Sequence, residues 1–247
     1  MPAQPWQPER PDAIDLLRDA EVEEAALLAA GSNYVYLLTL RHPDAGAGYA
    51  VYKPQRGEAP LGDFPDGTLY KREYAAYLVS EALAWGLIPA SVIREDGLPY
   101  GIGVVQLFIE HDPSQHYFNL REGRLDDMKR IALFDWITNN ADRKGGHTLL
   151  AADGRLWCID QGLSFHVDDK LRTVIWDFQG QPVPLDMLEE VCGFGERLEG
   201  DQHLRSELLR WITSAELERL QHRIHLVDRL RVYPPPPQYR PYPWPMI

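Results

Sequence analysis

The stretch Asp142-Arg143-Lys144-Gly145-Gly146-His147 is followed by a hairpin that ends at Asp160. Two apolar runs, 149–152 and 155–159, flank the pair Asp153-Gly154. Such a pair predicts a two-residue hairpin loop, because both loop positions favour a positive φ. Residue 152 then faces residue 155, and His147 lies opposite Asp160, with Cβ atoms about 5 Å apart. The pattern predicts an imidazole beside a carboxylate, with Asp142 in the preceding loop; an ordinary surface hairpin would also explain it.

Length and composition indicate one domain, 1–247, with ample apolar content for a buried core. The net charge of −12, from 25 basic and 37 acidic residues, argues against a nucleic-acid partner and against docking on anionic lipid. No apolar run approaches the roughly 20 residues that span a bilayer, so we expect no integral membrane association. The first ten residues lack the apolar stretch of a signal peptide, and we expect a cytoplasmic protein.

Periodicity divides the chain into a strand-rich half and a helical half. Strands are predicted at 34–40, 49–52, 91–94 and 103–109, and helices at 15–30, 68–85, 125–139, 185–198, 203–212 and 214–230. The fold class is therefore α+β with two lobes, an N-lobe over 12–109 and a C-lobe over 110–233, with a ligand cleft between them. The Pro-rich tail, 234–247, is expected to be polyproline-like, and either binds an aromatic groove of a partner or wraps its own domain.

Five polar residues occur in the order that ATP-dependent phosphoryl transfer needs. Such a site uses a loop over the phosphates, a strand lysine held by a helix glutamate, a base and metal ligands. Taken singly, each candidate has a plainer explanation: a strand lysine is commonly an edge residue, and a helix glutamate is commonly solvated. Their joint order is what indicates a site: Lys53, Glu73, Asp142, His147 and Asp160.

The segment 134–147 resembles the catalytic loop of the phosphatidylinositol 3-/4-kinase family, and 158–165 resembles that family's metal-binding motif. The likeness extends over roughly residues 30–200 and is most specific at Asp142-Arg143 and at Ile159-Asp160-x-Gly162. Small bacterial kinase-related members of the protein-kinase-like superfamily are the nearest in pattern, and secreted-protein kinases and HipA-type kinases share the scaffold. The resemblance implies a two-lobed protein-kinase-like fold.

The resemblance also implies roles for single residues. Lys53 would contact the α- and β-phosphates of ATP, and Glu73 would orient it. Asp142 would be the catalytic base, Asp160 would bind Mg²⁺ or Mn²⁺, and Arg143 would brace the loop or a phosphate. The remaining implied contacts are a phosphate loop, Gly31, Ser32, Asn33 and Tyr34, and an adenine-contacting strand, Gln106, Leu107 and Phe108.

His147 departs from the family pattern, in which asparagine occupies this position. An asparagine oxygen suits Mg²⁺, whereas an imidazole suits Mn²⁺ and other transition metals better. The enzyme therefore uses Mn²⁺, does without the second metal, or binds nucleotide without turnover; His147 is alternatively a structural histidine. We expect an ATP-dependent kinase that acts on a hydroxyl of a soluble small molecule or protein, with the acceptor unidentified. The alternatives are a regulatory pseudokinase and an AMP transferase.

Overall fold

The computed structural model describes residues 4–28 and 32–247. Its N-terminal part is built on a five-stranded antiparallel sheet with the order β1-β2-β3-β5-β4. The strands are β1 (Glu21–Leu28), β2 (Val35–His42), β3 (Gly46–Pro54), β4 (Ser91–Arg94) and β5 (Gly103–Leu107). Helix α1 (Ala13–Asp19) packs on this sheet, and its Leu16 and Leu17 join Leu38 and Tyr52 in the smaller of two main apolar cores.

The first strand corrects the sequence prediction of a helix over 15–30. Helix α1 ends at Asp19, Ala20 is extended, and 21–28 pair with β2; residues 29 and 30 lie outside the described part. The segment is rich in Glu, Ala and Leu, which favour helices in isolation. Pairing along the open edge of β2 overrides this local preference, as tertiary context often does.

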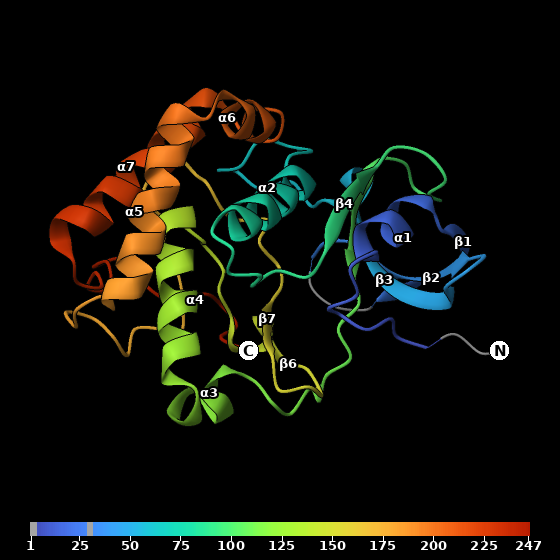
Figure 1. Ribbon diagram of the computed structural model, residues 1–247, viewed down its shortest axis with the longest axis horizontal. Coiled ribbons are helices and arrows are strands. Elements are labelled where there is room, and N and C mark those ends of the chain that lie inside the picture. Colours follow the sequence, from blue (N-terminus) through green and yellow to red (C-terminus); the bar gives the residue numbers. More distant parts are fainter. Residues whose placement is uncertain (1–3, 29–31) are drawn as a thin grey trace.

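Helix α2 (Leu69–Ala82) lies between the sheet and the helical half of the molecule (Figure 1). Thr68 occupies the N-cap position, but the Glu58 carboxylate accepts the first hydrogen bonds, from the N–H groups of Leu69 (3.0 Å) and Tyr70 (2.8 Å). The buried Arg72 donates to the carbonyl of Ser164 (2.7 Å) and pairs with Glu216 on α7 (Ser214–Leu230). The helix is thereby fixed to the helical lobe.

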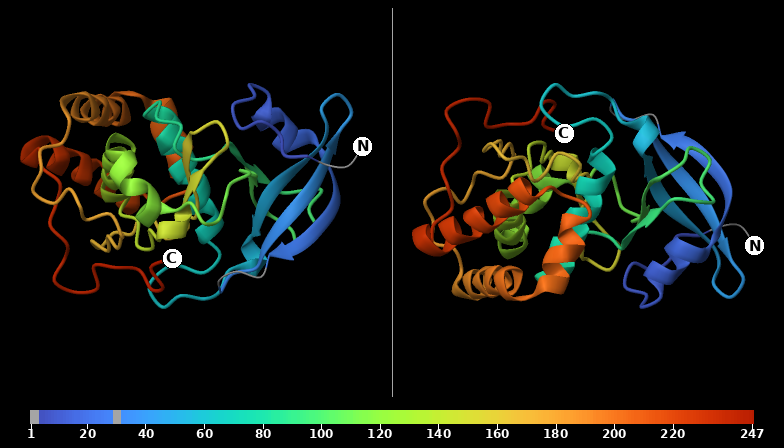
Figure 2. Two further views of the ribbon diagram at one scale, coloured as in Figure 1. Left: turned by 90° about the horizontal axis from the view of Figure 1, so that it is seen from below. Right: turned by 90° about the horizontal axis from the view of Figure 1, so that it is seen from above.

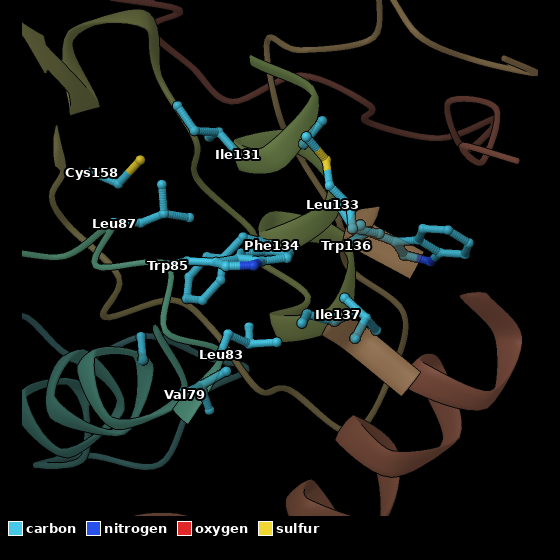
Figure 3. Packing of buried hydrophobic residues seen from close by; sticks show 14 of the residues in the cluster. Val79, Leu83, Trp85, Leu87, Ile131, Leu133, Phe134, Trp136, Ile137 and Cys158 are labelled. Atoms are coloured by element: carbon cyan, nitrogen blue, oxygen red, sulfur yellow. The ribbon is translucent and has the colours of Figure 1, made fainter. Parts of the chain in front are cut away.

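The C-terminal half is helical and contains the larger apolar core. Its other helices are α3 (Tyr117–Leu120), α4 (Leu125–Thr138), α5 (Leu185–Gly200) and α6 (Gln202–Leu209). Figure 3 shows Val79 of α2 and Leu83, which follows this helix, lying toward Phe134 and Ile137 of α4, so this core joins both halves. Helix α7 begins with a capping box, in which Thr213 and Glu216 exchange hydrogen bonds.

The molecule as a whole has a sheet-rich and a helical lobe (Figure 1), and this confirms the predicted α+β, two-lobed fold class. A small hairpin, β6 (Thr148–Leu150) and β7 (Leu156–Cys158), lies below α2 between the lobes. Within the described residues, we find no helix with the length and apolar character to cross a bilayer.

The Pro-rich tail wraps its own domain, one of the two interpretations drawn from the sequence. The carbonyl oxygen of Pro241 accepts hydrogen bonds from the Thr173 amide and the Trp176 indole, both at 3.1 Å. The carbonyl oxygen of Met246 accepts one from the Gly145 amide at 2.7 Å. In both views of Figure 2 the chain accordingly ends beside the segment that precedes the hairpin.

Candidate functional site

The site is organised around Lys53 on β3. Alternation along this strand buries Ala50, Tyr52 and Pro54 and turns Lys53 to the opposite side of the strand. The Lys53 Nζ lies 2.9 Å from Glu73 Oε1 and 3.2 Å from Asp160 Oδ1. Residues far apart in the sequence, from β3, α2 and the segment after β7, thus meet at one ammonium group.

The charges of this cluster support one another. Burial lowers the pKa of Lys53, but Asp160 and Glu73 outweigh it, so that the pKa is raised above its ordinary value and the ammonium persists. The Lys53 ammonium in turn holds the pKa of Asp160 well below its usual range. Glu73 is 1% exposed, and its second oxygen accepts a hydrogen bond from the Gln161 amide at 2.8 Å. Glu73 therefore fixes both the lysine and the backbone beside Asp160.

The hairpin brings His147 to Asp160, although its predicted register is wrong by one residue. Thr148 pairs with Cys158, and a three-residue loop, 152–154, ends in Gly154 with φ 86°. Three-residue hairpin loops, like two-residue ones, favour a glycine with positive φ. His147 therefore falls opposite Ile159, whose amide donates to the His147 carbonyl at 3.0 Å.

A one-residue shift normally turns a side chain to the other face of a strand. Asp160, however, lies past the end of β7 with φ 61°, where strand alternation no longer holds. Its Oδ2 consequently lies 3.3 Å from His147 Nε2. A positive φ at a residue other than glycine is strained and is common at functional sites. Burial lowers the pKa of His147 to about 4, in spite of the opposing attraction of Asp160, and the imidazole is neutral at pH 7.

Asp142 lies on the loop that follows α4. Its Oδ2 is 3.0 Å from the Nζ of Lys144, and its amide donates to Asn140 Oδ1 at 2.9 Å. Burial raises the pKa of the Asp142 carboxyl above its ordinary value, while Lys144 opposes this shift. A carboxylate with a raised pKa is a stronger proton acceptor, as a general base requires.

Arg143 braces this loop from within. Its guanidinium is fully buried and donates to both oxygens of Asp135 on α4, at 2.9 Å from Nε and 2.9 Å from Nη2. Its Nη1 donates to the carbonyls of His147 (3.2 Å) and Ile159 (3.1 Å). Burial disfavours the charge, but Asp135 more than compensates, and the pKa of Arg143 is raised. Of the two implied roles, bracing the loop or binding a phosphate, this geometry fits the bracing role.

A pocket opens over these charged groups. It is lined by Ser32, Asn33, Tyr34, Lys53, Glu58, Leu69, Glu73, Asp142, Lys144 and Asp160, among others. The Asn33 side chain accepts a hydrogen bond from the Ala59 amide (2.8 Å), and the Tyr34 amide donates to the Gly57 carbonyl (2.8 Å). These contacts tie the predicted phosphate loop to the segment 57–59; Gly31, its first residue, lies outside the described residues.

The three residues predicted to touch adenine do not line this pocket. Gln106 is buried, and its amide nitrogen donates to Ser91 Oγ at 3.1 Å. Leu107 packs in the core of the N-terminal sheet, and its amide donates to Ala90 O at 2.8 Å. The Phe108 amide donates to the Tyr49 carbonyl at 3.3 Å. Structural contacts therefore occupy the side chains of Gln106 and Leu107 and the backbone amides of Leu107 and Phe108.

The donor set fits a divalent cation. One ligand atom each from Asp142, His147 and Asp160 lies within 4.8 Å of the others. Two carboxylates suit Mg²⁺ and Mn²⁺ alike, and a neutral imidazole shifts the preference toward Mn²⁺. In the structure, the Lys144 amide donates to His147 Nδ1 at 3.4 Å, so the neutral imidazole carries its proton on Nε2, which faces Asp160. A cation bound at Nε2 would have to displace this proton.

Three residues with a place in this site were not predicted. Asp135 holds Arg143, Asn140 holds the Asp142 amide, and Lys144 contacts the Asp142 carboxylate. One sequence signal was available for the first of them: Asp135 is a charged residue that interrupts the apolar run 131–137 of a buried helix. A charge in such a run needs a partner, and Arg143 follows eight residues later.

Comparison with known proteins places this geometry in context. No protein-family model matches the chain. The crystal structure of the Golgi casein kinase matches with a TM-score of 0.54 and 13% identity, over 89% of this chain and 74% of that one. The structure of hydra Fam20 with sugar matches with a TM-score of 0.53 and 16% identity, over 88% and 86%. These likenesses show a shared fold, and that fold is kinase-like.

In sequence, the chain is 37% identical to Protein Rv2133c of Mycobacterium tuberculosis over 275 aligned positions, which cover 96% of each chain. The match extends over nearly the whole of both proteins, so it includes the lysine strand, the loop of Asp142 and the hairpin as one unit. The chain belongs to the same protein family as Rv2133c.

Proposed function

We propose that this protein is an ATP-dependent phosphotransferase of the phosphatidylinositol 3-/4-kinase-like type, which acts on a hydroxyl of a soluble small molecule or protein. The observation that carries the proposal is the clamp on Lys53, between Glu73 at 2.9 Å and Asp160 at 3.2 Å. A purely structural protein would not need a buried glutamate that holds a strand lysine toward an open pocket. The same arrangement in kinases binds the phosphates of ATP.

Each residue then has a task that follows from its position. Lys53 binds phosphate oxygens of ATP, and Glu73 keeps its ammonium aimed at the pocket. Asp142 accepts the proton of the acceptor hydroxyl while the hydroxyl oxygen forms a bond to the γ-phosphorus of ATP. The bond between that phosphorus and the bridging oxygen of ADP breaks in the same step. Lys144, 3.0 Å from Asp142, offsets the negative charge on the transferred group.

A divalent cation, Mg²⁺ or Mn²⁺, would be held by Asp160 and His147 with Asp142 beside them. When bound, it would neutralise charge on the phosphate oxygens. His147 also serves Asp160 without a cation, because its Nε2 lies 3.3 Å from the carboxylate and limits the positions that the carboxylate can take.

The comparisons support the reaction class and leave the acceptor open. One solved structure of this fold is, by its title, a casein kinase. The segments 134–147 and 158–165 support the phosphatidylinositol-kinase-like type, since their Asp142 and Asp160 lie in one pocket with Lys53. Regulation by a catalytically inactive scaffold would not require this full set of charged groups.

The test uses purified protein with ATP labelled at the γ- or the α-phosphate, in Mg²⁺ and in Mn²⁺, with candidate alcohols and proteins as acceptors. We expect transfer of the γ-label alone, favoured by Mn²⁺, and its loss in Asp142→Asn. Transfer of the α-label would identify an AMP transferase instead. Nucleotide binding by calorimetry without transfer of either label to any acceptor would favour the pseudokinase.

A further inference from the structure

A second cavity lies on the other side of Asp142. It has a volume of about 550 Å³ and is lined by Ala141, Asp142, Arg172, Arg240, Tyr242, Pro243, Trp244 and Met246. Asp142 also lines the pocket that holds Lys53 and Asp160. The carboxylate assigned as the base therefore borders two spaces, one on the nucleotide side and one whose wall is formed in part by the tail.

The tail is held in this position by backbone hydrogen bonds. Pro241 accepts from the Thr173 amide and the Trp176 indole, and Met246 accepts from the Gly145 amide. Gly145 follows Lys144 directly, so the tail is anchored next to the loop that carries Asp142. The tail segment that lines the second cavity is thus fixed to the rest of the fold by hydrogen bonds.

The cavity has a basic lining in an acidic protein. Arg172 and Arg240 face it, whereas the whole chain carries a net charge of −12. Among the described residues, neither guanidinium forms an ion pair with a carboxylate, although Arg172 is close enough to Asp142 to lower its pKa. Arg240 lies over the Tyr239 ring at 5.7 Å. At this cavity the two guanidinium groups outnumber the single carboxylate of Asp142, and the excess of positive charge favours an anionic ligand.

Aromatic side chains supply the rest of the wall. Trp244 is 87% exposed and Tyr242 is half-exposed, although both belong to a tail segment that the fold holds in place. Large exposed apolar side chains that gather at a cavity mark a binding surface. Aromatic rings that line the same cavity as two guanidinium groups suit a ligand with a carbon skeleton and a charged end.

We propose that this cavity binds the phosphoryl acceptor, and that the acceptor is a small alcohol carrying a phosphate or a carboxylate. The inference rests on the proposed phosphotransferase function. Arg172 and Arg240 bind the anionic group, and Tyr242 and Trp244 cover the carbon skeleton. The hydroxyl oxygen is then directed to the γ-phosphorus across Asp142; its proton passes to Asp142, and ADP and a phosphate ester are the products.

Binding of the acceptor is tested without ATP. Calorimetry with the full chain measures the affinity for glycerol 3-phosphate, D-glycerate and uncharged glycerol. We expect one or both of the charged probes to bind about tenfold or more tightly than glycerol, since charge-assisted hydrogen bonds have this magnitude. The phosphate and the carboxylate probes, measured separately, distinguish the two anion types.

Variants then locate the probe. Arg172→Gln and Arg240→Gln should each weaken the charged probe about tenfold, whereas Arg229→Gln, at an exposed arginine on α7, should not change it. Lys53→Ala should leave probe binding intact while it weakens nucleotide binding. Arg240 is exposed, so its variant remains informative if Arg172→Gln disturbs the loop.

The outcomes separate this inference from the proposed function. If the charged probe is lost in Lys53→Ala and kept in both arginine variants, the anion occupies the nucleotide pocket and the inference is wrong. The inference is also wrong if charged and uncharged probes bind with equal affinity, or if no probe binds. It is wrong as well if the γ-label is transferred to a protein acceptor and this transfer is unaffected by the arginine variants. Arginine-dependent probe binding without any label transfer would support the anion site and count against the phosphotransferase.

Discussion

The Nε2 atom of His147 lies 3.3 Å from Oδ2 of Asp160, although the two residues are not partners in the hairpin register. The backbone at Asp160, with φ 61°, produces this contact. His147 thus limits where the carboxylate can lie while its own pKa is lowered to about 4 by burial. Because of this pair, the stability of the fold should depend on pH. The metal preference of the site should likewise depend on the imidazole of His147.

Stability should fall as the pH is lowered through the range in which unfolded histidine gains a proton. The folded-state pKa of about 4 lies below the ordinary value of 6.5, so protons bind the unfolded chain first. The His147 contribution is complete above pH 6.5 and decreases toward pH 4; from pH 7 to pH 5 it amounts to about 2 kcal/mol. Urea denaturation at both pH values, in a chelating buffer, should show a smaller decrease for His147→Asn. Parallel decreases in the two proteins would contradict the assignment.

The metal preference should change with residue 147. In the wild type, we expect the ATP complex of Mn²⁺ to bind more tightly than that of Mg²⁺, because imidazole suits the transition metal. In His147→Asn the added oxygen ligand should reduce this ratio about tenfold. Calorimetry with a non-hydrolysable ATP analogue measures both affinities. An unchanged ratio would show that His147 does not contact the cation.

Nucleotide affinity should depend on Lys53. Lys53→Ala removes the ammonium and leaves Glu73 and Asp160 without their shared counter-charge. We expect affinity for the Mn²⁺ complex of ATP to fall about tenfold or more, the size of a lost charge-assisted contact. Lys129→Ala is the control, since that lysine pairs with the exposed Asp126 on α4. Equal losses in both variants would point to a general effect of charge.

The buried pair Arg143–Asp135 should dominate the stability of the loop that carries Asp142. Arg143→Ala leaves a carboxylate uncompensated in a fully buried position, and we expect a loss of about 3–5 kcal/mol in the free energy of unfolding. Arg210→Ala breaks the exposed pair with Glu207 and should cost about 0.5 kcal/mol or less. Urea denaturation compares the two. A loss in Arg143→Ala no larger than in the control would mean that the pair does not hold the loop.

The fold class and the cluster of charged residues around Lys53 were predictable because local sequence patterns indicate them. Strand alternation sets the direction of Lys53, and the motif around Asp142 has a distinctive order of charges. The hairpin loop length was not predictable, because Asp153-Gly154 fits loops of two or of three residues. The strand at 21–28 was also missed, since its helix-favouring composition is overridden by an edge of β2 that the sequence alone does not reveal.

The tail shows a different limit. Its attachment depends on the carbonyl oxygens of Pro241 and Met246, and backbone carbonyls are present at every residue whatever its side chain. Composition therefore indicated an extended segment but not where it would lie. The brace between Arg143 and Asp135 was signalled only in part. The charge of Asp135 in an apolar run indicates a partner, but the loop that returns Arg143 to α4 must be known before their contact can be predicted.

The attachment of α2 has a consequence for how this molecule can be switched on and off. Arg72 ties the helix to Ser164 and Glu216, and its Ala75, Ala76 and Val79 are embedded in the core of the helical lobe. An outward swing of this helix, which would separate Glu73 from Lys53, must break a buried ion pair and open that core. We therefore expect α2 to keep its place on the helical lobe, so that any separation of Glu73 from Lys53 comes from the strand that carries the lysine.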